Sequence, residues 1–178
     1  FKLPLNERKA NISVPEGELA RQREYAEAVR SIIEAKYSEP PKAFVHTYGC
    51  QGNVADGERL KGMLADMGYE LVEELEGADL VLYNTCAIRE HAEDRVFGNV
   101  GALKGMKNAN RDMRILLCGC MMQQEHVAEK IRNSYPFVDI VFGTHVIHRL
   151  PELLYNNLST GKRIYELPES DGVIAEEL

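Results

Sequence analysis

The stretch Ala43-Phe44-Val45-His46-Thr47-Tyr48-Gly49-Cys50-Gln51-Gly52-Asn53 contains the pattern on which the fold of this chain depends. An apolar run typical of a buried strand leads into a glycine and a cysteine, and a segment with helical spacing follows. Two later stretches repeat this order, one ending in NTCAIRE (84–90) and the other in LCGCMMQ (117–123). Cys50, Cys86 and Cys120 therefore each fall at a predicted turn from strand to helix.

These three cysteines are predicted to converge at one place. In an open α/β sheet the carboxyl ends of parallel strands lie along one edge, and the ligand crevice opens there. Neighbouring strands are only about 4.8 Å apart, so cysteines that follow different strands can reach one small ligand. Each thiol would also lie at a helix N-terminus, whose partial positive charge favours a thiolate. The sequence thus predicts a pocket lined by three thiolates.

The alternation of strands and helices across residues 42–166 predicts an α/β fold. We expect a doubly wound, mostly parallel sheet of about five strands, with right-handed crossovers that place helices on both faces. The strands are expected at 43–48, 69–72, 79–84, 114–117 and 139–143, and residues 163–165 form a candidate edge strand. A last helix is expected over 148–158.

The sequence also predicts how the chain is divided. Residues 1–41 are an N-terminal extension with one helix at about 19–37, which the Ser-Glu-Pro-Pro run at 38–41 ends. Residues 42–166 form the α/β domain, and 167–178 have the acidic, polar composition of a linker. Because the chain begins with Phe1 and not with Met, we expect it to be a fragment or a processed chain.

Composition limits the classes of function. A chain of 178 residues that is 44% apolar can bury the core of one domain. No apolar run has the length of a transmembrane helix and no signal-peptide pattern opens the chain, which indicates a soluble, cytoplasmic protein. The formal net charge of −7 argues against nucleic-acid binding by this piece alone, since binding to phosphates depends on Lys and Arg.

Several kinds of chemistry are open to three convergent thiols. Clustered cysteines in a non-secreted chain more often bind metal or catalyse than form disulfides. Structural zinc needs four ligands, usually as paired Cys-x2-Cys units that this chain lacks, so His46 or His126 would have to complete the set. A phosphate-directed nucleophile would need Cys-x5-Arg, which is also missing. An iron–sulfur cubane on three cysteines leaves one iron open to another ligand. The spacing favours the cluster, and a stand-alone zinc- or thiol-redox-binding interaction module is the alternative.

The fourth cysteine, Cys118, lies two residues before Cys120 and one step deeper in its predicted strand. Alternate strand residues share a face, so the two thiols can point the same way. Cysteine is among the residue types most often fully buried. We therefore expect a buried, apolar role for Cys118 and a ligand role for Cys120.

The motifs TYGCQGN (47–53), NTCAIRE (84–90) and GCMMQ (119–123), in this order, closely resemble those of the N-terminal domain of the methylthiotransferases. The resemblance covers about residues 42–165. Within that family the contexts are most similar to the MiaB group, the tRNA enzymes that add a methylthio group to C2 of N6-isopentenyladenosine at position 37. Gly52 departs from the bulkier residue, such as Met, expected there, and leaves the ligand untouched.

The resemblance implies that Cys50, Cys86 and Cys120 hold an auxiliary [4Fe-4S] cluster involved in sulfur delivery, and it gives Cys118 no ligand role. It further implies a second [4Fe-4S] cluster and S-adenosyl-L-methionine in a following radical domain, and a C-terminal TRAM domain that holds the tRNA. No Cys-x3-Cys-x2-Cys motif occurs in this chain, so the piece is expected to be inactive alone. The sequence carries no signal for the sulfur donor or for an oligomeric state.

Overall fold

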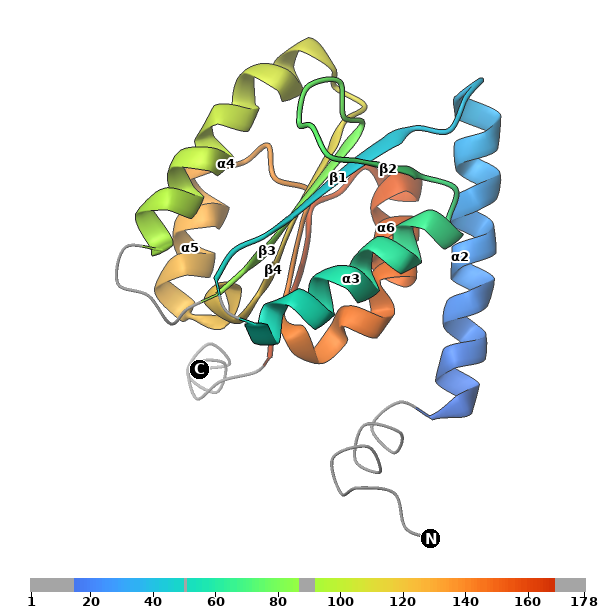
Figure 1. Ribbon diagram of the computed structural model, residues 1–178, viewed down its shortest axis with the longest axis horizontal. Coiled ribbons are helices and arrows are strands. Elements are labelled where there is room, and N and C mark those ends of the chain that lie inside the picture. The colour runs from blue at the N-terminus through green and yellow to red at the C-terminus, as the bar shows by residue number, and fades with distance from the viewer. Residues whose placement is uncertain (1–14, 50, 87–91, 169–178) are drawn as a thin grey trace, which may run out of the picture.

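The protein is a six-stranded parallel sheet with helices on both faces (Figure 1). The computed structural model describes residues 15–49, 51–86 and 92–168. The strands lie in the order β2-β1-β3-β4-β5-β6, and each paired strand is parallel to its neighbour. The predicted doubly wound α/β fold is confirmed, with one strand more than the five expected, because the candidate edge strand pairs along its length with β5.

The strands occur close to their predicted positions. Their bounds are β1 Lys42–Thr47, β2 Glu70–Val72, β3 Leu80–Thr85, β4 Arg114–Gly119, β5 Ile140–Phe142 and β6 Ile164–Glu166. All six residues of β3 are buried, as its continuous apolar run predicts for a strand covered on both sides. Leu80 and Leu82 enter the core on one face, while Val81 and Tyr83 enter the core on the other. This alternation follows from the two-residue period of a strand.

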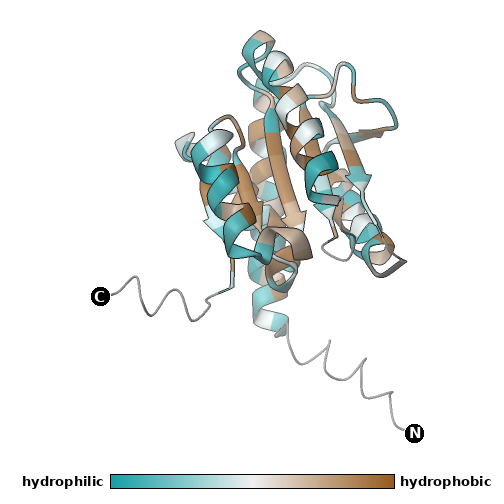
Figure 2. Ribbon diagram, turned by 90° about the vertical axis from the view of Figure 1, so that its left-hand side faces the viewer, coloured by the Kyte–Doolittle hydropathy of each residue, from teal (hydrophilic) through white to brown (hydrophobic). Residues whose placement is uncertain are grey.

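Two sets of helices cover the two faces of the sheet (Figure 1). On one face lie α2 (Glu16–Lys36), α3 (Gln51–Asp66) and α6 (Leu150–Thr160), and on the other lie α4 (Ala92–Ala109) and α5 (Glu125–Ser134). Two 3-10 helices, η1 (Cys120–Gln123) and η2 (Thr144–Arg149), follow β4 and β5. Apolar residues concentrate in the strands and on the inner faces of the helices (Figure 2). In the described part of the chain, no helix is long and apolar enough to cross a membrane.

The helix expected at about 19–37 is α2, and it packs on the α/β domain of its own chain. Val29 and Ile33 are buried in the same core as Leu154. The buried carboxylate of Glu152 on α6 accepts hydrogen bonds from Gln22 (2.9 Å), from Arg21 (3.3 Å) and from Arg149 (3.1 Å). The α2–α6 contact is therefore both apolar and ionic.

The last helix begins two residues later than expected. Residues 144–149 form η2 instead of α-helix, and α6 starts at Leu150 with Pro151 in its first turn. Proline is favoured there because its missing N–H would have no partner within the helix. His148 therefore lies outside α6, in the 3-10 turn that follows β5.

Candidate functional site

The candidate site lies at the carboxyl edge of the sheet, where β1, β3 and β4 end side by side (Figure 1). Strand order reverses between β1 and β3, since β2 lies on one side of β1 and the remaining strands on the other. From this point α3 leaves to one face of the sheet, and α4 follows β3 on the opposite face. In open α/β sheets, a crevice forms outside the strand ends at such a switch point.

The register of the sheet places Cys86 and Cys120 at the same step of neighbouring strands. Thr85 on β3 pairs with Gly119 on β4, and each cysteine is the next residue of its chain segment. Neighbouring strands are about 4.8 Å apart, so the two backbones leave the sheet close together. Cys86 is buried and Cys120 is exposed. The register therefore brings close together the turns that carry these two cysteines.

The turn after β1 touches Cys86 directly. Gly49 has φ of +95°, a conformation that L side chains rarely adopt. A Cβ atom added to Gly49 would lie 2.9 Å from Cys86 Sγ and closer still to Cys86 Cβ. Glycine is required here both by the backbone angle and by the close approach. Cys50 follows this glycine and lies outside the described residues, as do residues 87–91.

The turn after β4 is equally close to β3. Gly119 has φ of +109°, and an added Cβ would lie well under 3.0 Å from the carbonyl oxygen of Thr85. Gly49 therefore fits against Cys86, and Gly119 fits against Thr85, the residue before Cys86. Both glycines belong to the cysteine motifs, and each allows its turn to approach β3.

Four buried polar side chains tie these turns together. The Asn53 amide donates from Nδ2 to the Thr85 carbonyl oxygen at 2.6 Å, and Asn84 Nδ2 donates to the Asn53 carbonyl oxygen at 2.9 Å. Thr85 Oγ1 donates to the Cys118 carbonyl oxygen at 2.7 Å. The Cys118 thiol lies 3.6 Å from Asn84 Oδ1 and donates to it. We call Asn53, Asn84, Thr85 and Cys118 the edge network.

Cys118 and Cys120 differ sharply in environment. Cys118 is fully buried in the core that α2, α3 and α6 cover, and burial raises the pKa of its thiol far above the ordinary value. Cys120 begins η1 and is exposed at the end of the sheet. Cys118 thus stays a neutral thiol inside the domain. It is buried as expected, but it is not purely apolar, because its thiol donates to Asn84.

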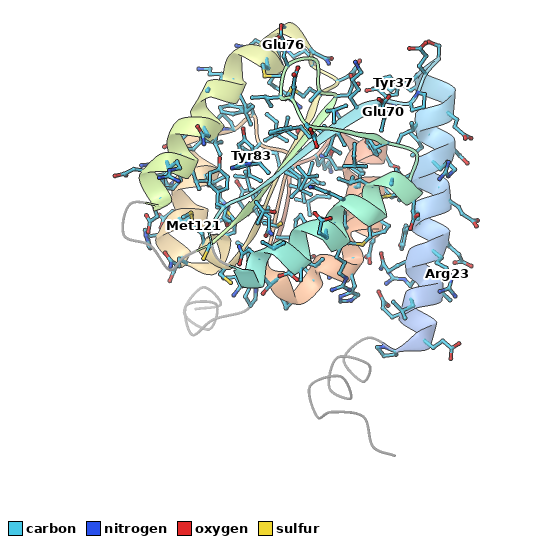
Figure 3. The ribbon with its side chains drawn as sticks, in the orientation of Figure 1. Arg23, Tyr37, Glu70, Glu76, Tyr83 and Met121 are labelled. Atoms are coloured by element: carbon cyan, nitrogen blue, oxygen red, sulfur yellow. The ribbon has the colours of Figure 1, made fainter. Side chains whose placement is uncertain are left out.

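An aromatic wall stands beside the site on the face that α4 covers. Tyr48 and Tyr83 meet edge to face with ring centroids 5.6 Å apart, and His46 meets Tyr48 in the same way at 4.5 Å. Figure 3 shows Tyr83 on this face of the sheet. Burial raises the pKa of Tyr83 to about 12, and burial lowers the pKa of His46. Asn99 of α4 donates to the Tyr48 hydroxyl at 2.6 Å, which joins this wall to the helix.

The third motif is anchored through its last residue to the start of η2, just after β5. Gln123 Oε1 accepts hydrogen bonds from the Thr144 backbone N–H (2.8 Å) and from its hydroxyl (2.9 Å). Met121 and Met122, which lie between Cys120 and Gln123 in the sequence, are fully buried. Figure 3 shows Met121 near the ends of β3 and β4. The motif GCMMQ therefore contributes one exposed thiol, two buried apolar side chains and one glutamine that hydrogen-bonds Thr144.

The arrangement fits a ligand that several thiolates hold. Cys86 and Cys120 project from adjacent strand ends, and the residue before Cys50 abuts Cys86. The α3 helix begins at Gln51, the residue that follows Cys50 in the sequence. Among the described residues no three His, Cys, Asp or Glu side chains gather to hold a metal, and the predicted trio includes Cys50, which is outside them.

The two histidines considered as zinc ligands have other surroundings. His126 Nε2 lies 3.0 Å from a Glu93 carboxylate oxygen and joins α5 to α4. His46 packs among Phe44, Tyr48 and Tyr83 along β1. The donor set at the strand ends is therefore sulfur, which suits iron–sulfur clusters and soft metal ions.

Sequence reasoning missed the edge network. In the sequence Asn53 is only the last residue of the first cysteine motif, yet it lies in the first turn of α3 and reaches across to β3. Asn84 is the last residue of the strand predicted at 79–84 and Thr85 belongs to the second cysteine motif, and the sequence indicated no hydrogen-bond partner for either. A signal was present, because fully buried Asn and Thr side chains at a strand end require hydrogen-bond partners.

The comparisons with known proteins agree with this geometry. The model of the uncharacterized protein family UPF0004 matches residues 42–143, from the start of β1 to just past β5. This chain belongs to the UPF0004 family. The matched part of this UPF0004 chain includes all three cysteine motifs and the whole edge network.

Three curated relatives of this UPF0004 chain carry the same name, tRNA-2-methylthio-N(6)-dimethylallyladenosine synthase. The protein from Clostridioides difficile is 40% identical over 174 residues, which are 96% of this chain and 36% of the relative. The protein from Thermoanaerobacter sp. is 44% identical over 168 residues (94% and 35%), and that from Caldicellulosiruptor saccharolyticus is 50% identical over 130 residues (73% and 28%). The resemblance to the methylthiotransferases is confirmed, and this chain spans about a third of the length of these relatives.

Proposed function

We propose that this chain is the cluster-binding domain of a tRNA methylthiotransferase. In this proposal Cys50, Cys86 and Cys120 hold an auxiliary [4Fe-4S] cluster, with residues 1–41 as an extension and 167–178 as a linker. The observation that carries it is the close fit of the cysteine-bearing turns, with Gly49 against Cys86 and Gly119 against Thr85. The names of relatives that are 40–50% identical support the reaction class.

The full-length protein would add a methylthio group to C2 of N6-isopentenyladenosine at tRNA position 37. A second [4Fe-4S] cluster and S-adenosyl-L-methionine belong to a following radical domain, and a TRAM domain would hold most of the tRNA. The net charge of −7 is consistent with a tRNA grip outside this piece. We place the full-length protein in the cytoplasm, together with its tRNA and a sulfur donor.

The residues of this chain would hold, orient and shield the cluster. When bound, the cluster supplies an iron that three cysteines leave open to a sulfur ligand. Met121 and Met122, which follow Cys120, are fully buried, and Cys86 is itself buried. The wall of Tyr48 and Tyr83 keeps its hydroxyls protonated, because burial raises both pKa values. The cysteines would therefore stand beside tyrosine hydroxyls that stay neutral.

Anaerobic reconstitution of this chain with iron and sulfide tests the proposal. We expect about four irons and four acid-labile sulfides per chain. Changing Cys50, Cys86 or Cys120 singly to Ser should remove most of the cluster, whereas Cys118→Ser, the matched control, should keep it. Stoichiometric zinc with no bound sulfide would instead support the stand-alone zinc module.

Activity measurements test the second half of the proposal. This chain alone, given S-adenosyl-L-methionine, a reductant and prenylated tRNA, should form no methylthiolated nucleoside, whereas the full-length protein should form it. Mass spectrometry of the digested tRNA detects the product. Product formed by this chain alone would overturn the assignment of the radical chemistry to a separate domain.

A further inference from the structure

The edge network links all three cysteine motifs through residues that are not ligands. We infer that Asn53 and Cys118 are positioning residues, which hold the cysteine-bearing turns in place before any metal binds. This inference rests on the proposed function only for its link to a cluster. Its physical content, the preformed arrangement of the thiols, can be tested with a simple metal ion.

Asn53 joins the first motif to the second at two points. Its side-chain amide donates to the carbonyl oxygen of Thr85, the residue before Cys86. Its own carbonyl oxygen accepts from the amide of Asn84. Asn53 is three residues after Cys50, so these bonds fix the beginning of α3 relative to the end of β3. Loss of the Asn53 side chain would release the turn that carries Cys50.

Cys118 reinforces the orientation of Asn84. An amide side chain has one accepting and one donating end. The Asn53 carbonyl oxygen accepts from the Nδ2 end, 2.9 Å away. The Cys118 thiol, 3.6 Å from Asn84 Oδ1, donates to the oxygen end, so both contacts favour the same orientation. Cys118 therefore acts on the site through Asn84 and as a neutral donor.

The same network reaches the third motif. Thr85 Oγ1 donates to the carbonyl oxygen of Cys118, two residues before Cys120. Asn84, Thr85 and Cys118 are fully buried, and Asn53 is nearly so. A buried polar group that loses its partner destabilises its surroundings more than an exposed one, because water cannot replace the bond. A single broken link would thus loosen the neighbouring turns as well.

The network contains no charged side chain. Thiolates and an iron–sulfur cluster carry negative charge, and the network places no charge of its own beside them. Its amide and hydroxyl donors bind backbone oxygens, and its thiol donates to the side-chain oxygen of Asn84. Residues outside the first coordination shell of a metal typically change its affinity by about 10- to 100-fold when they are replaced.

Titration of the metal-free chain with Co²⁺ measures the arrangement directly, since thiolate ligation produces intense charge-transfer absorption. We expect Asn53→Ala to raise the Co²⁺ dissociation constant by about 10- to 100-fold. Cys118→Ala should raise it in the same direction, whereas Cys118→Ser, which keeps a donor, should restore an affinity close to that of the unchanged chain. This rescue separates hydrogen bonding from the mere presence of sulfur.

Asn157→Ala is the matched control for loss of stability. Asn157 is also fully buried, and its amide donates to the Lys162 carbonyl oxygen at 2.9 Å, but it lies at the end of α6. We expect this variant to lower the unfolding midpoint while the Co²⁺ affinity stays unchanged. If Asn157→Ala weakened Co²⁺ binding as much as Asn53→Ala, the effect would be one of general stability and the inference would be wrong.

The outcomes for the inference and for the proposed function can be told apart. Tight Co²⁺ binding that depends on Asn53, in a chain that assembles no [4Fe-4S] cluster, would support the inference and overturn the function. The opposite outcome is an intact cluster in Asn53→Ala and Cys118→Ala, with the Co²⁺ affinity and the electron paramagnetic resonance spectrum unchanged. That result would support the proposed function and overturn the inference.

Discussion

The edge network at the carboxyl end of the sheet and the contact between α2 and α6 are both buried and polar, but only the second is charged. At the edge, two amides, a hydroxyl and a thiol bind backbone oxygens or one another. Between α2 and α6, the carboxylate of Glu152 is shared by Arg21, Arg149 and Gln22. The first joins turns that carry cysteines, and the second attaches an N-terminal helix to the domain.

This difference indicates what each region is built for. A neutral network does not titrate near neutral pH and adds no charge beside thiolates. A buried carboxylate with two guanidinium partners holds an element strongly as long as all partners are present, and its contribution depends on pH. Changes at the edge should therefore affect metal binding, whereas changes at Glu152 should affect stability and its pH dependence.

The largest effect is expected from Gly119→Ala, which breaks the edge of the sheet. The added methyl group would collide with the Thr85 carbonyl oxygen, and the backbone angle of +109° disfavours any side chain. We expect a loss of more than about 3 kcal/mol in the free energy of unfolding, together with loss of metal binding. Because the chain has no Trp, urea unfolding is best followed by circular dichroism.

Gly98→Ala is the control for this change. Gly98 lies within α4, and a Cβ added there meets nothing within 4 Å. Alanine should stabilise that helix by about 0.5–1 kcal/mol relative to glycine. Equal effects of the two substitutions would show that the close fit of Gly119 against β3 is unimportant.

The second effect is expected from Glu152→Ala, which breaks the charged contact. Arg149 and Gln22 would lose their shared acceptor, so the free energy of unfolding should fall by about 2–3 kcal/mol. Amide hydrogen exchange should rise chiefly in α2, because α2 is the element that Glu152 attaches. Co²⁺ affinity should stay unchanged, and a marked loss of affinity would contradict the separation of the two regions.

The sequence predicted the layers of this fold far better than its polar contacts. The continuous apolar run of β3 and the helical spacing of Val96, Val100 and Leu103 on α4 are local patterns, and all of these residues are buried. Strand ends that carry cysteines follow from the geometry of parallel sheets, so the edge of the site could be predicted as well.

Contacts between distant segments had no such signal. Gln22 and Glu152 are 130 residues apart, and Asn53 and Thr85 are 32 apart, and no periodicity links either pair. The start of α6 was predicted too early for a related reason, since the 3-10 turns of η2 have apolar residues at spacings that also suit an α-helix. Side-chain partners across elements depend on the final packing, which a single sequence does not reveal.

The third effect concerns the pH dependence of the stability that Glu152 contributes. Burial alone would raise the pKa of Glu152, but hydrogen bonds from Arg149 and Gln22 and the charges of both arginines outweigh it, so its pKa lies below the ordinary 4.5. The stabilisation is thus complete above pH 4.5 and is lost as the pH falls through the lower value of the folded state. Glu152→Gln should be less stable than the unchanged chain by about 1–2 kcal/mol at pH 7, and this difference should shrink below pH 4.5. A difference that stayed constant down to pH 3 would contradict the ionised state of Glu152.

The smallest effect is expected at the other end of α2, where Lys36 Nζ lies 3.0 Å from the Asp112 carboxylate. The hydrogen bond and charge of Lys36 lower the pKa of Asp112, but 63% of the Asp112 side chain is exposed, so water and salt screen the pair. Asp112→Ala should change the free energy of unfolding by at most about 0.5 kcal/mol, and 1 M NaCl should remove even that difference. Urea unfolding at low and high salt measures both quantities. Both pairs attach α2 by charge, so an effect as large as that of Glu152→Ala would mean that burial is not what makes the Glu152 contact strong.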